Sequence, residues 1–319
     1  MDAGLLYQNA KIKSKEGELF GKDKMQRLID AATAEEALRV LQEGGYPAGE
    51  TYTDVLAAAE REATLFFKSA AVSGYGLERF LLLNDYHNAK VAAKKCYFEA
   101  KSEAYKPDGL SEAKKIEECL EKEDYSSLPE EMAAAFREIK SAAVSERLAP
   151  SFIDVTLDKA MFSAVMRGVS SAHPAVRTYF VRLADFTNLA VAYRAKRAAV
   201  PVAAFRDMLV TEGEISLREV SAVYELGEEE GADKLALSGV YRGALSAMKE
   251  GVAAYETYVD DALLDPIKKA RYDMFSPAAV IGFYLGKLRE IKNVRLIFAK
   301  INNGLDKEVI KVRMRELYV

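Results

Sequence analysis

Few side chains in this sequence are of the kinds that catalyse reactions or bind metals. The only histidines are His87 and His173, and the only cysteines are Cys96 and Cys119. A zinc site needs several such ligands at characteristic spacing, and these four residues do not show that spacing. The sequence therefore predicts no metal site, no cofactor and no catalytic residue. Two cysteines also argue against a disulfide framework and fit a reducing compartment.

Two glycines beside a lysine superficially resemble a phosphate-binding loop. Gly282, Gly286 and Lys287 approximate the required pattern, but the segment is one residue short. Leu288 also stands where a serine or threonine would bind magnesium. The segment lies in an apolar helical stretch, so we interpret both glycines as positions of close packing.

An acidic cluster is the second candidate for chemistry, because all-α isoprenoid synthases hold magnesium diphosphate on aspartate-rich helices. Asp261 and Asp265 are four residues apart and would share one helix face. With Asp260 they form a motif one residue longer than the usual DDxxD, and no partner acidic motif occurs elsewhere. Pro266 follows directly, which favours a helix start with Asp265 as its N-cap. A magnesium–diphosphate enzyme stays an alternative, but we favour a structural role.

The elements that position these residues are predicted to be helices. Good helix formers dominate the composition, and there are 8 prolines and 19 glycines. Thr33 with Glu36, and Ser216 with Glu219, read as capping boxes ahead of apolar runs. Convincing alternation of apolar and polar residues is missing. The fold class is therefore predicted to be all-α.

Three segments of the chain share a pattern in which an acid is followed three positions later by an asparagine. The acids are Asp85, Asp185 and Glu290, and the asparagines are Asn88, Asn188 and Asn293. The asparagines stand 100 and 105 residues apart. A second landmark lies 34, 34 and 33 residues before them, at Asp54, Asp154 and Asp260. This recurrence predicts a repeated unit of about 100 residues.

The repeat predicts three similar helical-bundle units in a pseudo-threefold arrangement. Their expected bounds are 1–87, 88–187 and 188–292, with a closing segment at 293–319. A partial fourth copy surrounds Asn9, so we expect the two terminal segments to pack near each other, although an open α-solenoid would give a similar signal. The repeated asparagines could line a central opening or bond to helix ends, and we favour the second role.

Charge is unevenly distributed along the chain. The net charge of −4 argues against nucleic acid as a partner. Residues 212–234 carry eight acids against two bases, and residues 285–319 carry nine bases against four acids. These stretches are either solvated helix faces or complementary patches for protein partners. No signal peptide and no run of about 20 apolar residues is visible, so direct membrane insertion is not expected.

The stretch from Phe275 to Leu305, FSPAAVIGFYLGKLREIKNVRLIFAKINNGL, resembles the C-terminal signature of the C subunit of V/A-type ATPases. The same family includes the d subunit of the vacuolar proton pump. The segment Asp85–Lys90 and the opening Tyr7–Gly21, followed by a helix ending at Gly45, are also similar to it. The resemblance therefore spans nearly the whole chain.

The resemblance implies a funnel-shaped, non-catalytic adaptor of the central stalk. Such an adaptor receives the rotor shaft, formed by the D and F subunits, and sits on the membrane ring of proteolipid subunits. It lies peripherally at the cytoplasmic face of the membrane, couples ion transport to ATP hydrolysis or synthesis, and is monomeric when isolated. The resemblance also implies that catalysis belongs to the A and B subunits.

The basic stretch supplies the candidate docking residues, which we predict to be Lys292, Arg295 and Lys300. The family motifs carry over as structural positions, including Asn88, Asn188, Asn293 and the Gly304-Leu305 turn. The middle copy departs from the pattern, with Leu189-Ala190 where the other copies have a basic residue second. We therefore do not expect the three units to take equal part in docking. A helical-repeat scaffold unrelated to rotary pumps remains the main alternative.

Overall fold

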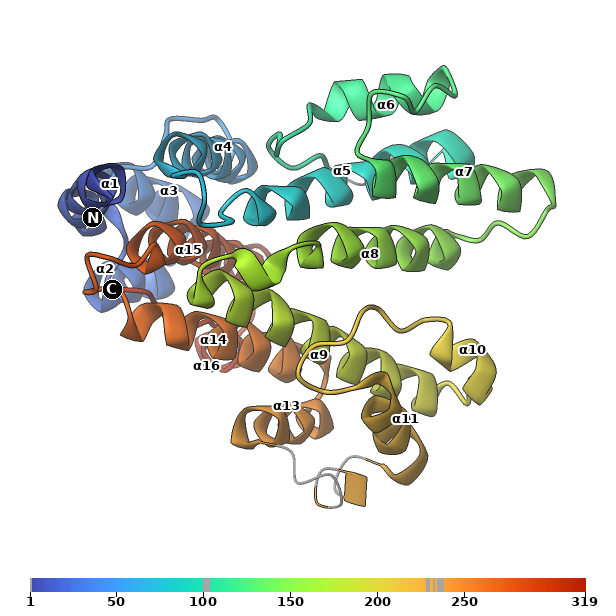
Figure 1. Cartoon of the computed structure of the whole chain (residues 1–319). Helices are drawn as coiled ribbons and strands as arrows, with labels where there is room; N and C mark the ends of the chain where they lie inside the picture. The colour runs from blue at the N-terminus through green and yellow to red at the C-terminus, as the bar shows by residue number, and fades with distance from the viewer. Residues whose placement is uncertain (1, 100–103, 228–229, 232, 234–237) are drawn as a thin grey trace. The chain divides into compact units, whose positions relative to one another are not determined.

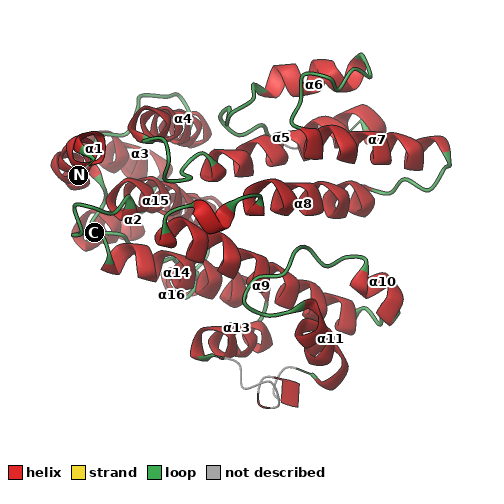
Figure 2. Cartoon of the chain, in the orientation of Figure 1, coloured by secondary structure: helices red, strands yellow, loops and turns green. Residues whose placement is uncertain are grey.

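A computed structural model describes residues 2–99, 104–227, 230–231, 233 and 238–319 (Figure 1). Over these ranges every regular element is a helix and none is a strand, which confirms the predicted all-α fold (Figure 2). Within the same ranges, no helix combines the length and the apolar character needed to cross a membrane. The chain divides into two compact units, unit 1 (residues 1–75 and 236–319) and unit 2 (residues 76–235).

Unit 1 combines helices from two distant parts of the sequence. The first part contributes α1 (Ala3–Lys15), η1 (Glu16–Glu18), α2 (Lys22–Asp30), α3 (Ala34–Glu43) and α4 (Tyr52–Ala70). The second contributes α13 (Gly239–Glu250), α14 (Val252–Lys269), α15 (Ala278–Asn303) and α16 (Lys307–Lys311). The long helix α15 packs against α14 and also against α1, α2, α3 and α4. It therefore joins the two parts of the unit.

The core of unit 1 depends on this long-range packing. Apolar side chains of α2, α3 and α4 are buried against those of α15, among them Leu28, Leu41, Val55, Leu56, Ile291, Val294 and Phe298. The ring of Tyr52, at the start of α4, stacks on the ring of Phe298 with centroids 4.5 Å apart. Burial of this kind stabilises helices that are marginal in isolation. The N-terminal helices therefore need α15 to bury their apolar faces.

Unit 2 builds a similar bundle from one continuous stretch of chain. Its helices are α5 (Arg79–Phe98), α6 (Ala113–Glu121), α7 (Glu130–Val144), α8 (Pro150–Met166), η2 (Val169–Ser171), α9 (Pro174–Arg197), α10 (Val202–Arg206) and α11 (Leu217–Leu226). Helix α5 packs against α6, α7 and α8, as α15 packs against α2, α3 and α4. The core between them includes Tyr86, Ile116, Met132, Phe136, Ile153 and Leu157.

Side-chain caps set several helix starts. Ser216 and Glu219 form the predicted reciprocal capping box at the start of α11. Thr33 caps α3 by accepting a hydrogen bond from the N–H of Glu36. The carboxylate of Glu36 accepts from the N–H of Ala32 rather than from that of Thr33. Of the capping box predicted at Thr33 and Glu36, only the hydrogen bond to the Thr33 side chain is therefore formed.

The predicted helix start at Asp265 is wrong. Helix α14 continues through Pro266 to Lys269. Proline lacks the N–H that would bond to the carbonyl one turn back, so α14 loses one of its hydrogen bonds there. The buried side chains of Leu264 and Ile267 on either side hold this turn in the core despite that loss. Asp265 instead accepts a hydrogen bond from Lys269, one turn later.

Candidate interaction surface

Each repeated asparagine is buried and binds the backbone of the non-helical segment that returns along its helix. Asn88 on α5 accepts a hydrogen bond from the N–H of Lys106 (2.8 Å) and donates to its carbonyl (3.1 Å). Asn293 on α15 makes the same pair with Arg315 at 2.8 Å and 2.9 Å. A primary amide can donate and accept at once, so it satisfies both backbone groups of its target.

The middle copy shows the same arrangement with a shift of one residue. Asn188 on α9 accepts from the N–H of Val210 (2.9 Å) and donates to the carbonyl of Thr211 (3.0 Å). All three asparagines are fully buried. They therefore fix the segment that follows each long helix, rather than lining an opening or bonding to a helix end.

The repeated acids of unit 2 hold the same returning segments closer to the next helix. Asp85 accepts from the N–H groups of Leu110 (2.9 Å) and Ser111 (3.1 Å), just before α6. Asp185 likewise accepts from the two N–H groups that precede Ser216, the N-cap of α11. Each acid and its asparagine lie one turn apart, so together they clamp two points of one segment.

A glycine lets each segment approach its acid. A Cβ atom on Gly109 would lie 2.3 Å from Oδ1 of Asp85, and one on Gly213 would lie 2.4 Å from Oδ1 of Asp185. Both distances are too short for any side chain, so glycine is required by close approach. The sequence interpretation missed these two positions. They stand 24 and 28 residues after the acids, so no constant offset marks them in the sequence.

The third acid, Glu290, binds a segment from the other part of unit 1. Its carboxylate accepts a hydrogen bond from the N–H of Phe20 (2.7 Å) and another from the hydroxyl of Tyr46 (2.7 Å). The ammonium of Lys287 completes the site at 2.6 Å. Burial and the neighbouring Glu290 charge raise the pKa of Tyr46 well above its ordinary value, so its hydroxyl stays a donor.

The predicted docking residues all lie on α15 and already have partners within unit 1. Lys292 forms an ion pair with Asp260 (2.8 Å), and Arg295 forms one with Glu60 (3.0 Å). The ammonium of Lys300 donates to two backbone carbonyls where α2 ends. Lys292 and Arg295 keep 46% and 51% of their side-chain surface exposed, so their charges still reach solvent.

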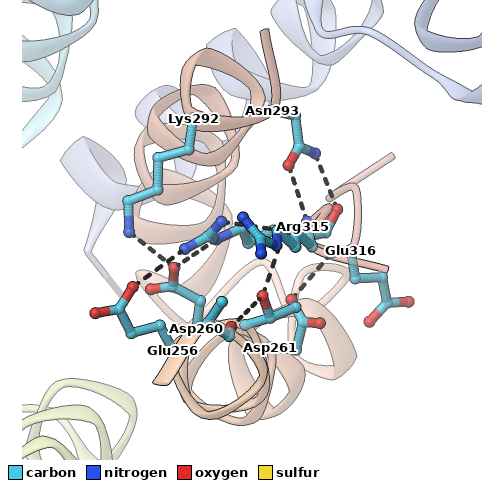
Figure 3. Close-up of polar contacts among 10 residues, drawn as sticks. Glu256, Asp260, Asp261, Lys292, Asn293, Arg315 and Glu316 are labelled. Carbon is cyan, nitrogen blue, oxygen red and sulfur yellow. Dashed lines mark hydrogen bonds and ion pairs between the residues drawn. The ribbon is translucent and has the colours of Figure 1, made fainter. Parts of the chain in front are cut away.

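Asp260 is the centre of a charged cluster where α14, α15 and the last residues of the chain meet (Figure 3). It accepts from Lys292 on α15 and from Nε of Arg315 (3.0 Å). The Arg315 guanidinium also reaches Glu256 at 4.0 Å. Asp261 accepts from the backbone N–H of Glu316 (2.9 Å). The cluster therefore ties three segments together through alternating charges.

The two adjacent aspartates differ in their acidity. Burial acts to raise the pKa of Asp260, but the positive charges of Lys292 and Arg289 outweigh it and hold that pKa below the ordinary value. For Asp261 burial dominates, and its pKa is raised. The cluster thus stabilises the charged form of Asp260, whereas burial destabilises the charged form of Asp261.

The three aspartates of the second landmark make different contacts. Asp54 is at the third position of α4 and forms a capping box with Thr51. Asp154 on α8 forms an ion pair with Lys94 on α5 at 3.0 Å. Asp260 belongs to the cluster described above. Their equal spacing from the asparagines therefore does not correspond to one shared contact.

Two acids that the sequence interpretation overlooked pair with the repeat. Lys90 stands two residues after Asn88 and binds Asp158 on α8 at 2.6 Å. Arg295 stands two residues after Asn293 and binds Glu60 on α4. In both copies a base at this position joins the long helix to a helix packed beside it. The basic residues were visible in the repeat, but their acidic partners share no spacing.

The remaining candidates for chemistry have structural contacts. The Nε2 atom of His87 lies 3.2 Å from the carbonyl oxygen of Ala104, and His173 caps α9 through the N–H of Ala175. A Cβ atom on Gly282 would lie 2.4 Å from the ring of Tyr318, which confirms the interpretation as close packing. Within the described ranges, no group of three or more His, Cys, Asp or Glu could hold a metal ion.

The acidic stretch 212–234 is partly used for helix capping. Glu212 accepts from the N–H of Leu217, and Glu219 belongs to the capping box of α11. Positions 228, 229, 232 and 234 of this stretch lie outside the described residues. Its role as a patch for a partner stays a prediction.

Comparison with known proteins gives a match along almost the whole chain. Residues 8–313 match the family described as ATP synthase (C/AC39) subunit. The chain is 25% identical to the C subunit of the A-type ATP synthase of Desulfurococcus sp. (strain SY), over 96% of this chain and 89% of that protein. It is 21% identical to the C subunit of the V-type sodium ATPase of Enterococcus hirae, over 97% of this chain and 98% of that protein.

Proposed function

Because the chain belongs to the ATP synthase (C/AC39) subunit family, and so to the subunits of rotary V/A-type ATPases, we propose that it is the non-catalytic adaptor of the central stalk. It would join the D–F rotor shaft to the membrane proteolipid ring and lie peripherally at the cytoplasmic face of the membrane. In that position it would couple ion transport to ATP hydrolysis or synthesis. The match over residues 8–313 is the observation that carries this proposal.

The buried clamps support a role in passing torque. An adaptor between a narrow shaft and a wide ring must deform little under load, and dense packing with satisfied buried polar groups gives that stiffness. Asn88 and Asn188 each fix a returning segment to its long helix through two hydrogen bonds. These bonds limit the sliding of one element past another within unit 2.

We assign the docking contact in this proposal to the exposed charges of α15. Lys292 and Arg295 are about half exposed and can meet carboxylates of a partner without leaving their own ion pairs. Lys300, the third candidate, also ties α15 to the end of α2. A change at Lys300 would therefore affect stability as well as docking.

The experiment that tests the proposal is affinity purification of the tagged chain from gently solubilised membranes, followed by mass spectrometry. Recovery of the D and F subunits together with the proteolipid ring is the expected result. A preparation free of ATPase subunits, from cells that express the pump, would reject the adaptor role. In that case a helical scaffold unrelated to rotary pumps would be the better description.

A further inference from the structure

Residues 313–319, here called the strap, lie against α14 and α15 and are held mainly through their backbone. Asn293 binds both the N–H and the carbonyl of Arg315. Asp261 accepts from the N–H of Glu316. These contacts recognise peptide groups and place no demand on the side chains of the strap.

Basic side chains at the end of α14 hold the next two residues in the same way. Lys268 donates to the carbonyl of Leu317 at 2.8 Å, and Arg271, in the turn after α14, donates to the carbonyl of Tyr318. Thr257 makes a weaker contact with the carbonyl of Arg313 at 3.3 Å. Backbone atoms of residues 313 and 315–318 are therefore bound by side chains of α14, α15 and the turn between them.

Two side chains of the strap are deeply enclosed on α14 and α15, while a third, the exposed carboxylate of Glu316, accepts from Lys268 at 2.8 Å. The guanidinium of Arg315 lies on Asp260, and the Arg315 side chain is 13% exposed. The ring of Tyr318 lies where Gly282 and Gly286, one turn apart on α15, leave room for it. Tyr318 is 2% exposed. An arginine and a tyrosine three positions apart are thus the two most enclosed side chains of the strap.

The chain between α15 and the strap is weakly anchored. Residues 302–309 and 311–313 are exposed, and Ile310 alone in this stretch is buried. Within the strap, Met314 and Leu317 pack only partly buried against the core of unit 1. Opening of this region would uncover mainly the site of Tyr318, while the exposed residues before the strap have few buried contacts to lose, as expected of a segment that opens separately from the rest.

We propose that α14 and α15 form a binding site for a non-helical Arg-x-x-Tyr peptide segment, and that the strap is its exchangeable occupant. The buried carboxylate of Asp260 selects the arginine, and the surface over Gly282 and Gly286 selects the aromatic ring. The peptide-directed contacts tolerate different residues between them. A peptide of the same pattern takes the site when the strap leaves. Its apparent affinity equals its intrinsic affinity multiplied by the fraction of time for which the site is open.

The first test uses a fluorescent peptide with the sequence of residues 312–319, VRMRELYV, and the full-length chain carrying Tyr318→Ala. This change weakens the resident strap and leaves the site intact. We expect the peptide to bind the variant at least about tenfold more tightly than the wild type, because the site is open more often. A scrambled peptide should bind neither chain, and Tyr7→Ala, which alters an exposed aromatic residue of α1, should behave as wild type. A folded Tyr318→Ala chain that gains no affinity would overturn the proposal.

The second test needs no variant and decides the matter if Tyr318→Ala fails to fold. Hydrogen exchange of the wild-type chain should release the amides of Arg315 and Glu316 earlier than the buried amides of α15. Saturating peptide should speed their exchange further, because it prevents the strap from returning. If the amides of Arg315 and Glu316 exchange as slowly as those of α15, and the peptide does not change their rate, the strap is a fixed part of the core. The proposal would then be rejected.

Discussion

The carboxylate of Glu290 accepts a 2.7 Å hydrogen bond from the backbone N–H of Phe20, a residue 270 positions earlier in the chain. Phe20 leads into α2 in the way that Leu110 and Ser111, bound by Asp85, lead into α6. We infer that α2, α3 and α4 pack on α15 in the same arrangement in which α6, α7 and α8 pack on α5. One helical repeat would then combine the two terminal parts of the sequence, while the expected bounds at 87, 187 and 292 stay a prediction.

Replacement of Glu290 by glutamine should destabilise unit 1. The change leaves a neutral acceptor for Phe20 and Tyr46 and removes the buried charge that faces Lys287. Breaking one side of a buried ion pair costs on the order of 3 kcal/mol. Urea unfolding measures the loss, with Glu18→Gln as the control because that carboxylate is exposed. Equal midpoints for the two variants would contradict this account of Glu290.

Replacement of Asn188 by alanine should destabilise unit 2 by about 2–4 kcal/mol. The N–H of Val210 and the carbonyl of Thr211 would both lose their partner inside the protein. Asn303→Ala, at the exposed end of α15, is the matched control and should cost less than about 0.5 kcal/mol. Thermal and urea unfolding of the two variants would separate a clamp from a surface amide. Similar stabilities would show that the returning segment does not need Asn188.

Replacement of Gly213 by alanine should be more harmful than the same change at an open glycine. The new Cβ would meet Oδ1 of Asp185 at 2.4 Å, so the segment must move away from its acid. We expect a loss of about 2–3 kcal/mol, as for overpacking in a core. Gly239→Ala, at the start of α13, meets nothing within 4 Å and should be neutral or slightly stabilising. Calorimetry of both variants would check the contrast, and a neutral Gly213→Ala would refute the close approach.

Asp260→Asn and Asp261→Asn should change the pH dependence of stability in opposite directions. The pKa of Asp260 lies below 3.8, so its contribution is present at neutral pH and is lost as pH falls through that lowered pKa. The pKa of Asp261 lies above 3.8, so its charged form costs stability once pH rises through that raised pKa. The stability of the Asp260→Asn variant should therefore fall furthest below that of the wild type at neutral pH.

Asp261→Asn serves as the paired control. Its amide oxygen can still accept from the N–H of Glu316, while the unfavourable buried charge is gone. Its stability relative to wild type should improve as the pH rises from acid to neutral, and urea unfolding at several pH values measures both variants. Parallel pH curves for the two variants and the wild type would show that neither carboxylate is perturbed.

Lys292→Gln should weaken recovery of the ATPase partners and reduce the salt dependence of that recovery. Asp260 keeps Arg315 as a partner in this variant, and no second negative charge is placed beside it, so the fold should tolerate the change. Lys122→Gln is the control, because Lys122 is an exposed lysine in a single ion pair in unit 2. Pull-down at increasing salt gives the measurement. Unchanged recovery at low salt would remove Lys292 from the docking surface.

Arg295 needs a paired change, because it neutralises Glu60, a carboxylate that is 7% exposed. Arg295→Gln alone would remove the ion pair of Glu60 and should cost about 3 kcal/mol. The double variant with Glu60→Gln should recover part of that stability while still lacking the docking charge. Weak recovery of partners by a stable double variant would assign docking to Arg295, whereas normal recovery would assign it a structural role.

The fold class was accessible from the sequence because helix signals are local. Residue types at fixed offsets identify both the capping residues, such as Ser216, and the repeat of Asn88, Asn188 and Asn293. Local chemistry misled the interpretation at Asp265, where the Asp-Pro pair reads as a helix start. The core contacts of Leu264 and Ile267 keep α14 continuous there.

The partners of the repeated residues could not be predicted, because a side chain that binds backbone groups does not require any particular residue type at the position it binds. Asn88, Asn188 and Asn293 bind Lys106, Val210 with Thr211, and Arg315, which share no residue type. Ion pairs across neighbouring helices pose the same difficulty. The positions of Glu60 and Asp158 follow from how α4 and α8 are rotated in their bundles, and sequence periodicity does not fix that rotation.

The packing of α15 on α2, α3 and α4 sets an order of events during protein synthesis. Phe20 leaves the ribosome 270 residues before Glu290. At about 5–20 residues per second, this delay lasts roughly 14–54 s. During that time the apolar faces of α2–α4 have no α15 to cover them, whereas α5–α8 can complete their core as soon as α8 emerges. Nascent chains stalled before α15 should therefore offer their N-terminal helices to chaperones and proteases while α5–α8 are already protected.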